Sequence, residues 1–536
     1  MTLLRVDAPP PVRQQGALLL VVLLAAALLF YGLGERPLWW DEIVNVLIDR
    51  QDVREIFVSL YALPGKPTML DVHPPLFHLL QHAWIKAVGA SDLAVRFPSA
   101  AYALLALALL YRVGARLGGR TLGTLACLIA SLSPFWLLYA RMGRYYALTA
   151  MLGLAETFLF LELLRRPTRA RWITYRIVSL ALLYTDYMVA ALFVCQAAYL
   201  AWARPGRRWL VRWGGSLALV GLIYSPWLPV WYAQSVKMNL LVEADLARSV
   251  PGLALKFAFP ALSLAIGETI FPWEAPALAG IGLVVTLVIG GLRFLAVRPA
   301  PLAWPGRRMP FVLLFILLPI GCTIAVTTLV APTIPFVGIA NRTFFVFPFV
   351  ALLLAAGLVA IPRAAWRIGA LGLLVLVYAY GVRNYFAGEH FINPIYAVPI
   401  DQVVDDVLAR AQSGDAIFSN ADMGFGYYFA PRAPAEVAHF YWERDDGVAA
   451  LAALEEAIAQ GRPLPYRRLF LLTFGRDRSR RELPAAFTEG IRPRARLVWE
   501  QGYTPQDATY RQVKQRLLGR EDYRYKLLVQ LYEVGL

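Results

Sequence analysis

Repeated apolar runs of roughly 20 residues constrain this chain most, because that length lets an α-helix cross the hydrocarbon core of a membrane. A 536-residue chain that is 59% hydrophobic and 16% charged cannot bury so much apolar side chain in a soluble domain. The sequence predicts a polytopic α-helical membrane protein with about 11–13 transmembrane helices. Eleven spans are expected near residues 17–34, 95–113, 121–140, 143–164, 172–188, 189–203, 212–231, 275–296, 310–330, 343–361 and 366–386.

Arginine clusters between these runs predict the orientation. Five clusters free of Asp and Glu fall on one side of the membrane if the spans are placed correctly, and that side is cytoplasmic. We therefore expect a multi-pass cell (plasma or inner) membrane protein with a cytoplasmic N-terminus, the first span being retained rather than cleaved as a signal peptide. The clusters also account for the net charge of +16 without a nucleic-acid partner. They comprise Arg112, Arg116 and Arg120; Arg165, Arg166, Arg169, Arg171 and Arg176; Arg204, Arg207, Arg208 and Arg212; Arg293, Arg298, Arg307 and Arg308; and Arg363 and Arg367.

The outward face carries the longer segments. A first outer loop at 35–94 contains two stretches, 41–61 and 75–89, with apolar residues at helical spacing, and we expect amphipathic helices on the membrane surface. A second outer loop at 232–274 includes an apolar stretch that could re-enter the membrane. Residues 1–389 thus form the transmembrane part, and residues 390–536 are expected to form an extracytoplasmic soluble α/β domain. Its strand-like runs are 415–420, 468–474, 495–501 and 525–534, and its helical stretches are 400–412 and 447–460.

Two groups of acidic residues stand in the first outer loop. Asp41 and Glu42 lie in PLWWDEIVNV, and Asp71 and His73 lie in DVHPP, whose two prolines favour the start of a helix. A carboxylate at the membrane edge can act as a general base, and Asp, Glu and His can together bind a divalent metal such as Mn²⁺ or Mg²⁺. The alternative for Asp41 is a purely structural cap of the helix that follows it.

Three arginines stand on the outward side, against the positive-inside bias. Arg141 and Arg144 lie in YARMGRYYAL, and Arg342 lies in IANRTFFVFP. Each could extend its side chain to the membrane surface, or could bind an anion, and a guanidinium matches a phosphate group bidentately. Outward carboxylates and arginines together indicate a site for a lipid phosphate and an acceptor that loses a proton.

The residues WWDE, DVHPP and AVRFPSAAYALLALALLY resemble family 39 glycosyltransferases of the GT-C superfamily. This family includes the dolichyl-phosphate-mannose protein O-mannosyltransferases and their bacterial relatives, and the aminoarabinose transferases acting on lipid A share the architecture. PFWLLYARMGRYYAL, LLYTDYMVAALF and PTIPFVGIANRTFFVFPFVALLLAAGL are similar to the family's middle and late spans.

The resemblance implies a GT-C fold and transfer of a sugar from a polyprenyl-phosphate-linked donor, with inversion at the anomeric carbon. The family's essential loop carboxylate falls on Asp41, beside Glu42, where it would deprotonate the acceptor. The family's second acidic motif falls on Asp71 and His73. The acceptor is expected to be a glycolipid or cell-envelope glycan, because the sugar-binding domain of the eukaryotic protein mannosyltransferases has no counterpart here; a protein Ser or Thr stays an alternative.

The remaining site residues follow from the same interpretation. The outward arginines are expected to bind the donor phosphate: Arg141, Arg144 and Arg342. Asp71 and His73, together with Tyr145 and Tyr187, are expected to position donor or acceptor. No cofactor is required in this interpretation, and a divalent metal at Asp71 and His73 stays open.

Two other classes of protein are consistent with the composition. A transporter or flippase of lipid-linked sugars would place ionisable residues near the bilayer midplane, whereas here the spans are nearly free of charge apart from Glu156 and Glu162. A receptor or scaffold that acts through its C-terminal domain would leave Asp41 and His73 without a role. The enzyme hypothesis is therefore favoured.

Overall fold

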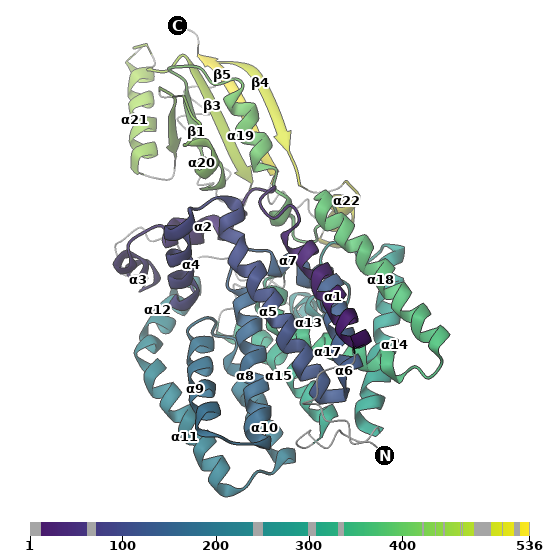
Figure 1. The fold of residues 1–536 in the computed structure, drawn as a ribbon. Coiled ribbons are helices and arrows are strands. Elements are labelled where there is room, and N and C mark those ends of the chain that lie inside the picture. Colours follow the sequence, from purple (N-terminus) through teal and green to yellow (C-terminus); the bar gives the residue numbers. More distant parts are fainter. Residues whose placement is uncertain are drawn as a thin grey trace. The chain divides into compact units, whose positions relative to one another are not determined.

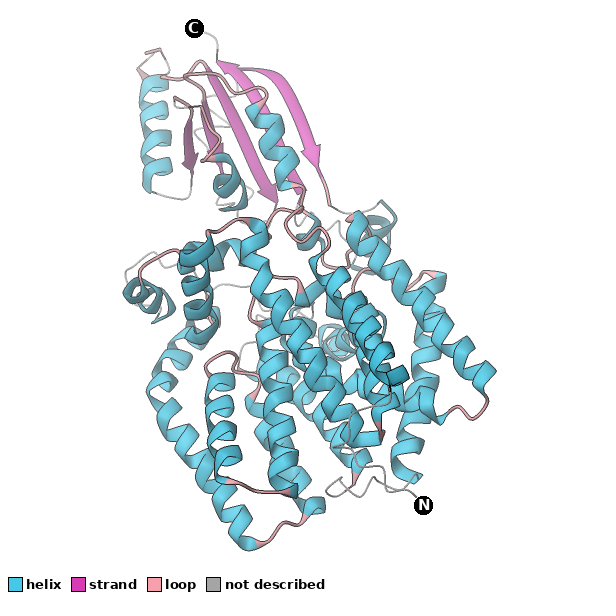
Figure 2. Cartoon of the chain, in the orientation of Figure 1, coloured by secondary structure: helices cyan, strands magenta, loops and turns pink. Residues whose placement is uncertain are grey.

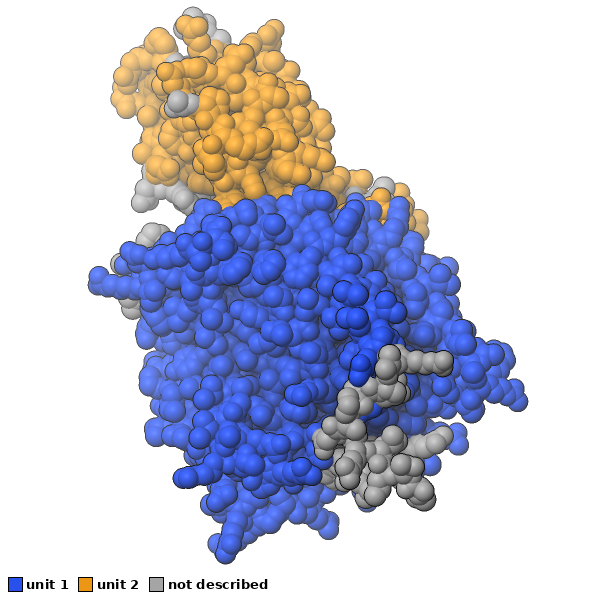
Figure 3. Space-filling view, viewed as in Figure 1, with its two compact units in different colours: residues 1–36, 44–387 blue, residues 37–43, 388–536 orange. Residues whose placement is uncertain are grey.

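The computed structural model describes residues 12–61, 71–239, 250–297, 307–330, 337–420, 423–434, 436–442, 445–460, 462–463, 465–475, 495–505, 508–518 and 526–534. The chain divides into two compact units, which are coloured separately in Figure 3. The first unit comprises Met1–Arg36 and Val44–Ala387, and the second comprises Pro37–Ile43 and Gly388–Leu536. Each unit is described by itself below.

The first unit is built of helices (Figures 1 and 2). Its first half consists of α1 (Val12–Phe30), α2 (Trp40–Asp49, begun in the second unit), α3 (Val53–Tyr61), α4 (Pro75–Val88), α5 (Asp92–Gly118), α6 (Arg120–Leu132), α7 (Pro134–Ala140), α8 (Tyr146–Arg165), α9 (Arg169–Leu183) and α10 (Ala190–Ala203). Its second half consists of α11 (Arg207–Tyr224), η1 (Ser225–Trp227), α12 (Leu228–Asn239), α13 (Val250–Ile266), α14 (Ala275–Val297), α15 (Arg308–Leu329), α16 (Val337–Arg342), η2 (Phe344–Val346), α17 (Phe347–Ala360) and α18 (Ala364–Ala387).

Each of the eleven predicted spans lies on one to three of these helices. Six helices in the described residues are long and apolar enough to cross a membrane, or seven if the bent pair α6 and α7 is one span. Four apolar helices of the described residues are shorter: Gln15–Phe30, Ala190–Ala203, Gly252–Ile266 and Phe344–Ala360. Length and composition alone therefore give fewer spans than the predicted eleven, but the chain is a multi-pass membrane protein.

The range predicted as a second outer loop is largely helical. Helix α12 continues from α11 and η1 to Asn239, and α13 contains the apolar stretch that the sequence suggested could re-enter the membrane. Residues 240–249 of this predicted loop, residues 62–70 of the first loop and Arg298 of a cytoplasmic cluster lie outside the described residues.

Two proline-containing turns place the polar residues of this unit. Pro134 starts α7 after an extended Ser133, and the axis turns by 69° between α6 and α7, because proline disfavours helical backbone at the residue before it. Helix α7 then ends directly before the turn that holds Arg144. Pro75 starts α4 in the same way, with Pro74 as an extended N-cap, so the helix predicted from DVHPP is confirmed.

The second unit contains a five-stranded sheet of order β2-β1-β3-β5-β4, with helices against it (Figure 2). Strand β1 pairs in parallel with β2 and β3, whereas β5 pairs antiparallel with β3 and β4. The α/β architecture predicted for the C-terminal region is therefore confirmed. Its elements are η3 (Pro394–Ala397), α19 (Ile400–Leu408), β1 (Ala416–Ser419), α20 (Met423–Phe429), β2 (Ala438–Tyr441), α21 (Asp445–Ala459), β3 (Arg468–Gly475), β4 (Ala495–Tyr503), α22 (Ala508–Leu518) and β5 (Lys526–Val534).

Alternating side chains of β1 give this sheet a core on both faces. Ile417 belongs to a buried cluster with Val403 and Val407 of α19, while Phe418 belongs to a second cluster with Leu454 of α21. Successive residues of a strand point to opposite faces, which explains why both faces of this short strand are apolar.

The PLWWDEI segment is part of the second unit. The backbone N–H of Leu38 donates to the hydroxyl of Tyr428 at 2.6 Å, and the Trp39 ring meets the Tyr396 ring edge-on at 4.9 Å. Leu38 and Trp39 therefore pack in a unit that is otherwise made from the C-terminal part of the chain.

Candidate active site

Four buried charged side chains from three parts of the first unit form one network. Arg144, in the turn between α7 and α8, donates to Oδ2 of Asp71 at 2.9 Å. His78 of α4 lies between two carboxylates, with Nδ1 at 2.6 Å from Oδ1 of Asp49 and Nε2 at 3.5 Å from Oδ2 of Asp71. All four side chains are at most 4% exposed, so water does not screen these contacts.

Helix α2 supplies further partners to this network. Asn45 accepts a hydrogen bond from Arg144 through its side-chain oxygen, and the backbone carbonyl of Asp49 lies 2.8 Å from Nδ1 of His82. His78 and His82 are one helical turn apart and both meet Asp49, so α4 is bound to the end of α2 by two contacts.

Burial and charge together determine the protonation states. Burial alone would raise the pKa of Asp71, but His73 and Arg144 outweigh it and hold that pKa well below its usual value. Burial raises the pKa of Asp49 to about 6, although His78 limits the rise. Burial would lower the pKa of His78, but Asp49 and Asp71 outweigh it and raise the pKa to about 10. At pH 7 the network therefore holds two negative and two positive charges.

His73 connects this network to a pocket. Its Nδ1 contacts Oδ1 of Asp71, and its ring lies 4.2 Å from the Tyr145 ring. Burial lowers the pKa of His73 despite the opposing charge of Asp71, so the ring is neutral at pH 7. A neutral imidazole that donates from Nδ1 has Nε2 as an acceptor.

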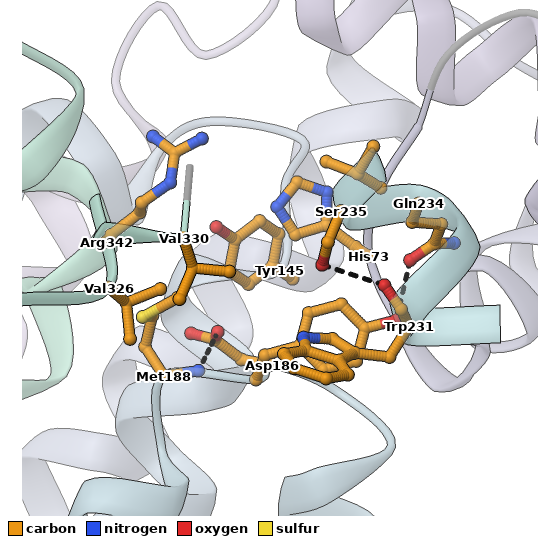
Figure 4. A pocket seen from close by; sticks show the side chains of 12 residues that line it. His73, Tyr145, Asp186, Met188, Trp231, Gln234, Ser235, Val326, Val330 and Arg342 are labelled. Carbon is orange, nitrogen blue, oxygen red and sulfur yellow. Dashed lines mark hydrogen bonds between the residues drawn. The ribbon is translucent and has the colours of Figure 1, made fainter. Parts of the chain in front are cut away.

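The pocket is partly open and has a cavity volume of about 70 Å³; its lining side chains are drawn in Figure 4. Predicted site residues on its wall are His73, Tyr145, Tyr187 and Arg342, which come from distant parts of the sequence. The remaining wall residues are Val72, Asp186, Met188, Trp231, Gln234, Ser235, Val326 and Val330. Aromatic surface with a few polar groups is typical of small-molecule sites.

Asp186 is a pocket residue that the sequence analysis did not single out. It lies in the turn between α9 and α10, is 4% exposed, and accepts a hydrogen bond from the backbone N–H of Met188 at 2.9 Å. The signal in the sequence was the polar YTDY interruption between two apolar runs.

Tyr187 acts mainly as part of the wall. Its hydroxyl donates to Gln234 at 2.7 Å and accepts from the Trp227 indole at 2.9 Å. Gln234 in turn donates to the Leu60 carbonyl at 2.8 Å, so these contacts hold α12 to the end of α3.

Arg342, at the end of α16, keeps its charge available to the pocket. One guanidinium nitrogen donates to the carbonyl of Gly338 at 2.6 Å and lies 3.3 Å from the side-chain oxygen of Asn341. Within the described part of the chain, Arg342 forms no ion pair.

Arg141 does not line this pocket, although the sequence grouped it with Arg144 and Arg342. Its guanidinium donates to the Leu28 carbonyl at 2.6 Å and lies 5.4 Å and 5.0 Å from the Tyr385 and Phe386 ring centres. These contacts hold α1 and α18 together through cation–π and hydrogen-bond interactions.

Asp41 and Glu42 lie on the first turn of α2, in the second unit. Glu42 accepts the backbone N–H of Trp39 at 3.1 Å, which is the return contact of a capping box. Asp41 is the second residue of α2 and lies in its first turn. Asp41, Asn45 and Asp49 follow at intervals of four residues, a spacing that puts side chains on one helix face.

The residues at Asp71 do not fit a divalent metal. Its Oδ1 contacts His73 and its Oδ2 faces Arg144 and His78, so positive groups and ring nitrogens already occupy both oxygens. Within the described ranges, no group of three or more His, Cys, Asp or Glu side chains is placed to hold a metal ion.

Residues 72–232 match the family model described as dolichyl-phosphate-mannose-protein mannosyltransferase. This match confirms, for that part of the chain, the resemblance to protein O-mannosyltransferases predicted from the sequence. It includes His73, Arg144, Tyr145 and Asp186, and it excludes Arg342. A comparison with curated proteins finds no significant match.

A comparison with solved structures finds, among others, the following two matches. The archaeal oligosaccharyltransferase AglB from Archaeoglobus fulgidus, in complex with an inhibitory peptide and a dolichol-phosphate, is 11% identical; the alignment covers 86% of this chain and 69% of that chain, with a TM-score of 0.47. ArnT from Cupriavidus metallidurans, bound to undecaprenyl phosphate, is 14% identical over 96% of this chain and 98% of that chain, with a TM-score of 0.43. What the pocket residues can do chemically follows from their own geometry.

Proposed function

We propose that this protein is an inverting glycosyltransferase that moves a sugar from a polyprenyl-phosphate-linked donor to an acceptor on the extracytoplasmic face of the membrane. The observation that carries the proposal is the pocket, where a guanidinium without an ion pair in the described residues shares the wall with a buried carboxylate and aromatic rings. The family match over residues 72–232 supports the same reaction class.

Arg342 would bind the donor phosphate. A guanidinium forms strong charge-assisted hydrogen bonds to phosphate oxygens, and its charge would stabilise the phosphate as it leaves. Nucleotide sugars are absent outside the cytoplasm, so a lipid phosphate held in the bilayer is the donor that an outward-facing enzyme can use.

Asp41 would act as the general base. It would take the proton from the acceptor hydroxyl while the acceptor oxygen attacks the anomeric carbon opposite the phosphate. The bond from that carbon to the phosphate oxygen breaks, the electron pair leaves with the phosphate, and the configuration inverts. The motive for this role is the resemblance of the WWDE segment to the loop carboxylate of family 39 glycosyltransferases.

The Asp71–Arg144 network would act through positioning. Asp71 holds His73 through Nδ1, and the Arg144 guanidinium lies 5.6 Å from the centre of the Tyr145 ring. Both rings line the pocket, so the network fixes two adjacent parts of its wall. Asp71 and Arg144 therefore need no direct contact with the substrate.

The acceptor class is part of the proposal. A glycolipid or cell-envelope glycan, presenting a hydroxyl or a phosphate, is favoured over a protein Ser or Thr. The reaction as written uses an arginine and a carboxylate, and it requires no cofactor.

The test is release of free polyprenyl phosphate by the purified full-length protein from a panel of polyprenyl-phosphate hexoses and pentoses, with membrane glycolipid as acceptor. The Asp41→Asn variant should lose about 10²–10⁴-fold or more in rate while it folds and binds donor normally. Asp52→Asn is the matched control, because the Asp52 side chain is 88% exposed in the same region of the sequence.

Two results would count against the proposal. Movement of intact donor across the bilayer, without release of polyprenyl phosphate from any donor, would identify a flippase instead. Normal turnover by Asp41→Asn would remove Asp41 from the reaction.

A further inference from the structure

A guanidinium and a carboxyl group line the pocket without forming an ion pair in the described residues. Arg342 and Asp186 both contribute to its wall. In the described residues, neither side chain has an ion-pair partner. A ligand that lies between them can therefore meet a positive group at one end and a negative group at the other (Figure 4).

Asp186 has unused capacity to accept hydrogen bonds. Of the described residues, only Met188 donates to it, at Oδ1. An ionised carboxylate offers about four acceptor positions, and a buried carboxylate is costly unless they are used. Hydroxyl groups of a ligand would supply the missing donors.

The other polar side chains in this part of the pocket are already engaged. Gln234 accepts a hydrogen bond from the Tyr187 hydroxyl and donates one to the Leu60 carbonyl. The Ser235 hydroxyl donates to the Trp231 carbonyl at 2.8 Å. Asp186 is therefore the strongest acceptor that this part of the wall can offer. The Trp231 ring, 36% exposed, supplies apolar surface for the C–H groups of a sugar.

We propose that Asp186 is the specificity-determining residue for the transferred sugar, binding its ring hydroxyls while Arg342 holds the phosphate. This inference rests on the proposed function and deepens it, because it assigns the orientation of the donor: phosphate toward α16, sugar toward the turn between α9 and α10. The bond that breaks then lies between the two charges.

The experiment compares two ligands on the full-length protein in nanodiscs: bare polyprenyl phosphate, and the polyprenyl-phosphate sugar that gives the fastest release in the panel. Asp186→Asn should weaken binding of the sugar-bearing donor by about 10- to 100-fold, as expected for lost hydrogen bonds to a charged acceptor. It should change the Kd of bare polyprenyl phosphate less than 2-fold, on the order of a few tenths of a kcal/mol. Arg342→Ala should weaken both ligands.

Glu268→Gln provides a matched control. Glu268 is another buried carboxylate of the same unit and does not line the pocket. It accepts a hydrogen bond from the Tyr139 hydroxyl at 2.9 Å. This variant should leave both affinities unchanged. Should Asp186→Asn fold poorly, Asp186→Glu, which moves the carboxylate by one methylene, should alter the preference among epimeric sugars and spare phosphate binding.

The possible failures are distinguishable. Equal weakening of both ligands by Asp186→Asn, or unchanged affinity for the sugar donor, would overturn the role of Asp186 and leave the glycosyltransferase proposal standing. Failure of the unmodified protein to bind polyprenyl phosphate and to release it from any donor would overturn the proposed function itself.

Discussion

Replacing Asp71 by Asn should destabilise the first unit strongly, and the structure gives the size of the effect. Asp71 is 2% exposed and contacts Arg144, which is 4% exposed. The Asn side chain keeps an oxygen for Arg144 but removes the negative charge, so a neutral network of four charges becomes a buried site with a net charge of +1. Removing one partner of a buried ion pair costs about 3–5 kcal/mol.

The double variant Asp71→Asn with Arg144→Gln separates charge imbalance from general damage. It removes one negative and one positive charge and leaves the Asp49–His78 pair, so it should cost less than the sum of the single variants by about 0.5–3 kcal/mol. Thermal and detergent-denaturant unfolding of the purified full-length variants measure this difference. Strictly additive losses, or an Asp71→Asn variant as stable as the original, would refute the idea that these residues act as one network.

Three further outcomes are expected. Stability should fall as the pH rises from about 6.5 to about 10, because the His78 pKa is raised from 6.5 to about 10 in the folded protein. The stabilisation by protonated His78 is complete below pH 6.5 and is lost as the pH passes through the folded-state pKa. Thermal unfolding of His78→Gln should lack this part of the pH profile. Arg141→Ala should lower the melting temperature but leave donor affinity unchanged. Arg342→Ala should instead reduce donor affinity about 10-fold or more, with little change in the melting temperature. Titration with polyprenyl phosphate measures both affinities. A metal chelator should leave the release of polyprenyl phosphate unchanged, while His73→Ala should reduce this release. If the chelator abolished activity and added Mn²⁺ or Mg²⁺ restored it, the reaction would not be metal-free.

The sequence predicted the elements of the fold well where their patterns were long. The apolar runs lie on helices, the prolines of DVHPP start α4, and four strand-like runs became β1, β3, β4 and β5. Strand β2 was missed because Ala438–Tyr441 is only four residues long and has no clear alternation. The range 232–274 was predicted as an outer loop, whereas α12 extends to Asn239 and α13 covers Val250–Ile266.

The site was predicted less completely, because sequence position does not tell where a long side chain points. Arg141 and Arg144 are three residues apart, yet one meets Leu28 and the other meets Asp71. Asp186 was overlooked because a single carboxylate in a short turn carries no motif, and only the pocket reveals that its oxygens have few partners. The proposed base, Asp41, is an assignment that the Asp41→Asn assay tests.

The network of Asp49, Asp71, His78 and Arg144 has a consequence for how the protein is made. Arg144 follows Asp71 by 73 residues, so at a synthesis rate of about 5–20 residues per second the carboxylate waits roughly 4–15 s for its partner. During that interval Asp49, Asp71 and His78 have to stay hydrated at the membrane surface, since an incomplete set of charges is costly to bury. The four buried charges are therefore complete only once the turn after α7 has been synthesised, so Arg144 determines when this part of the chain can be buried without an unpaired charge.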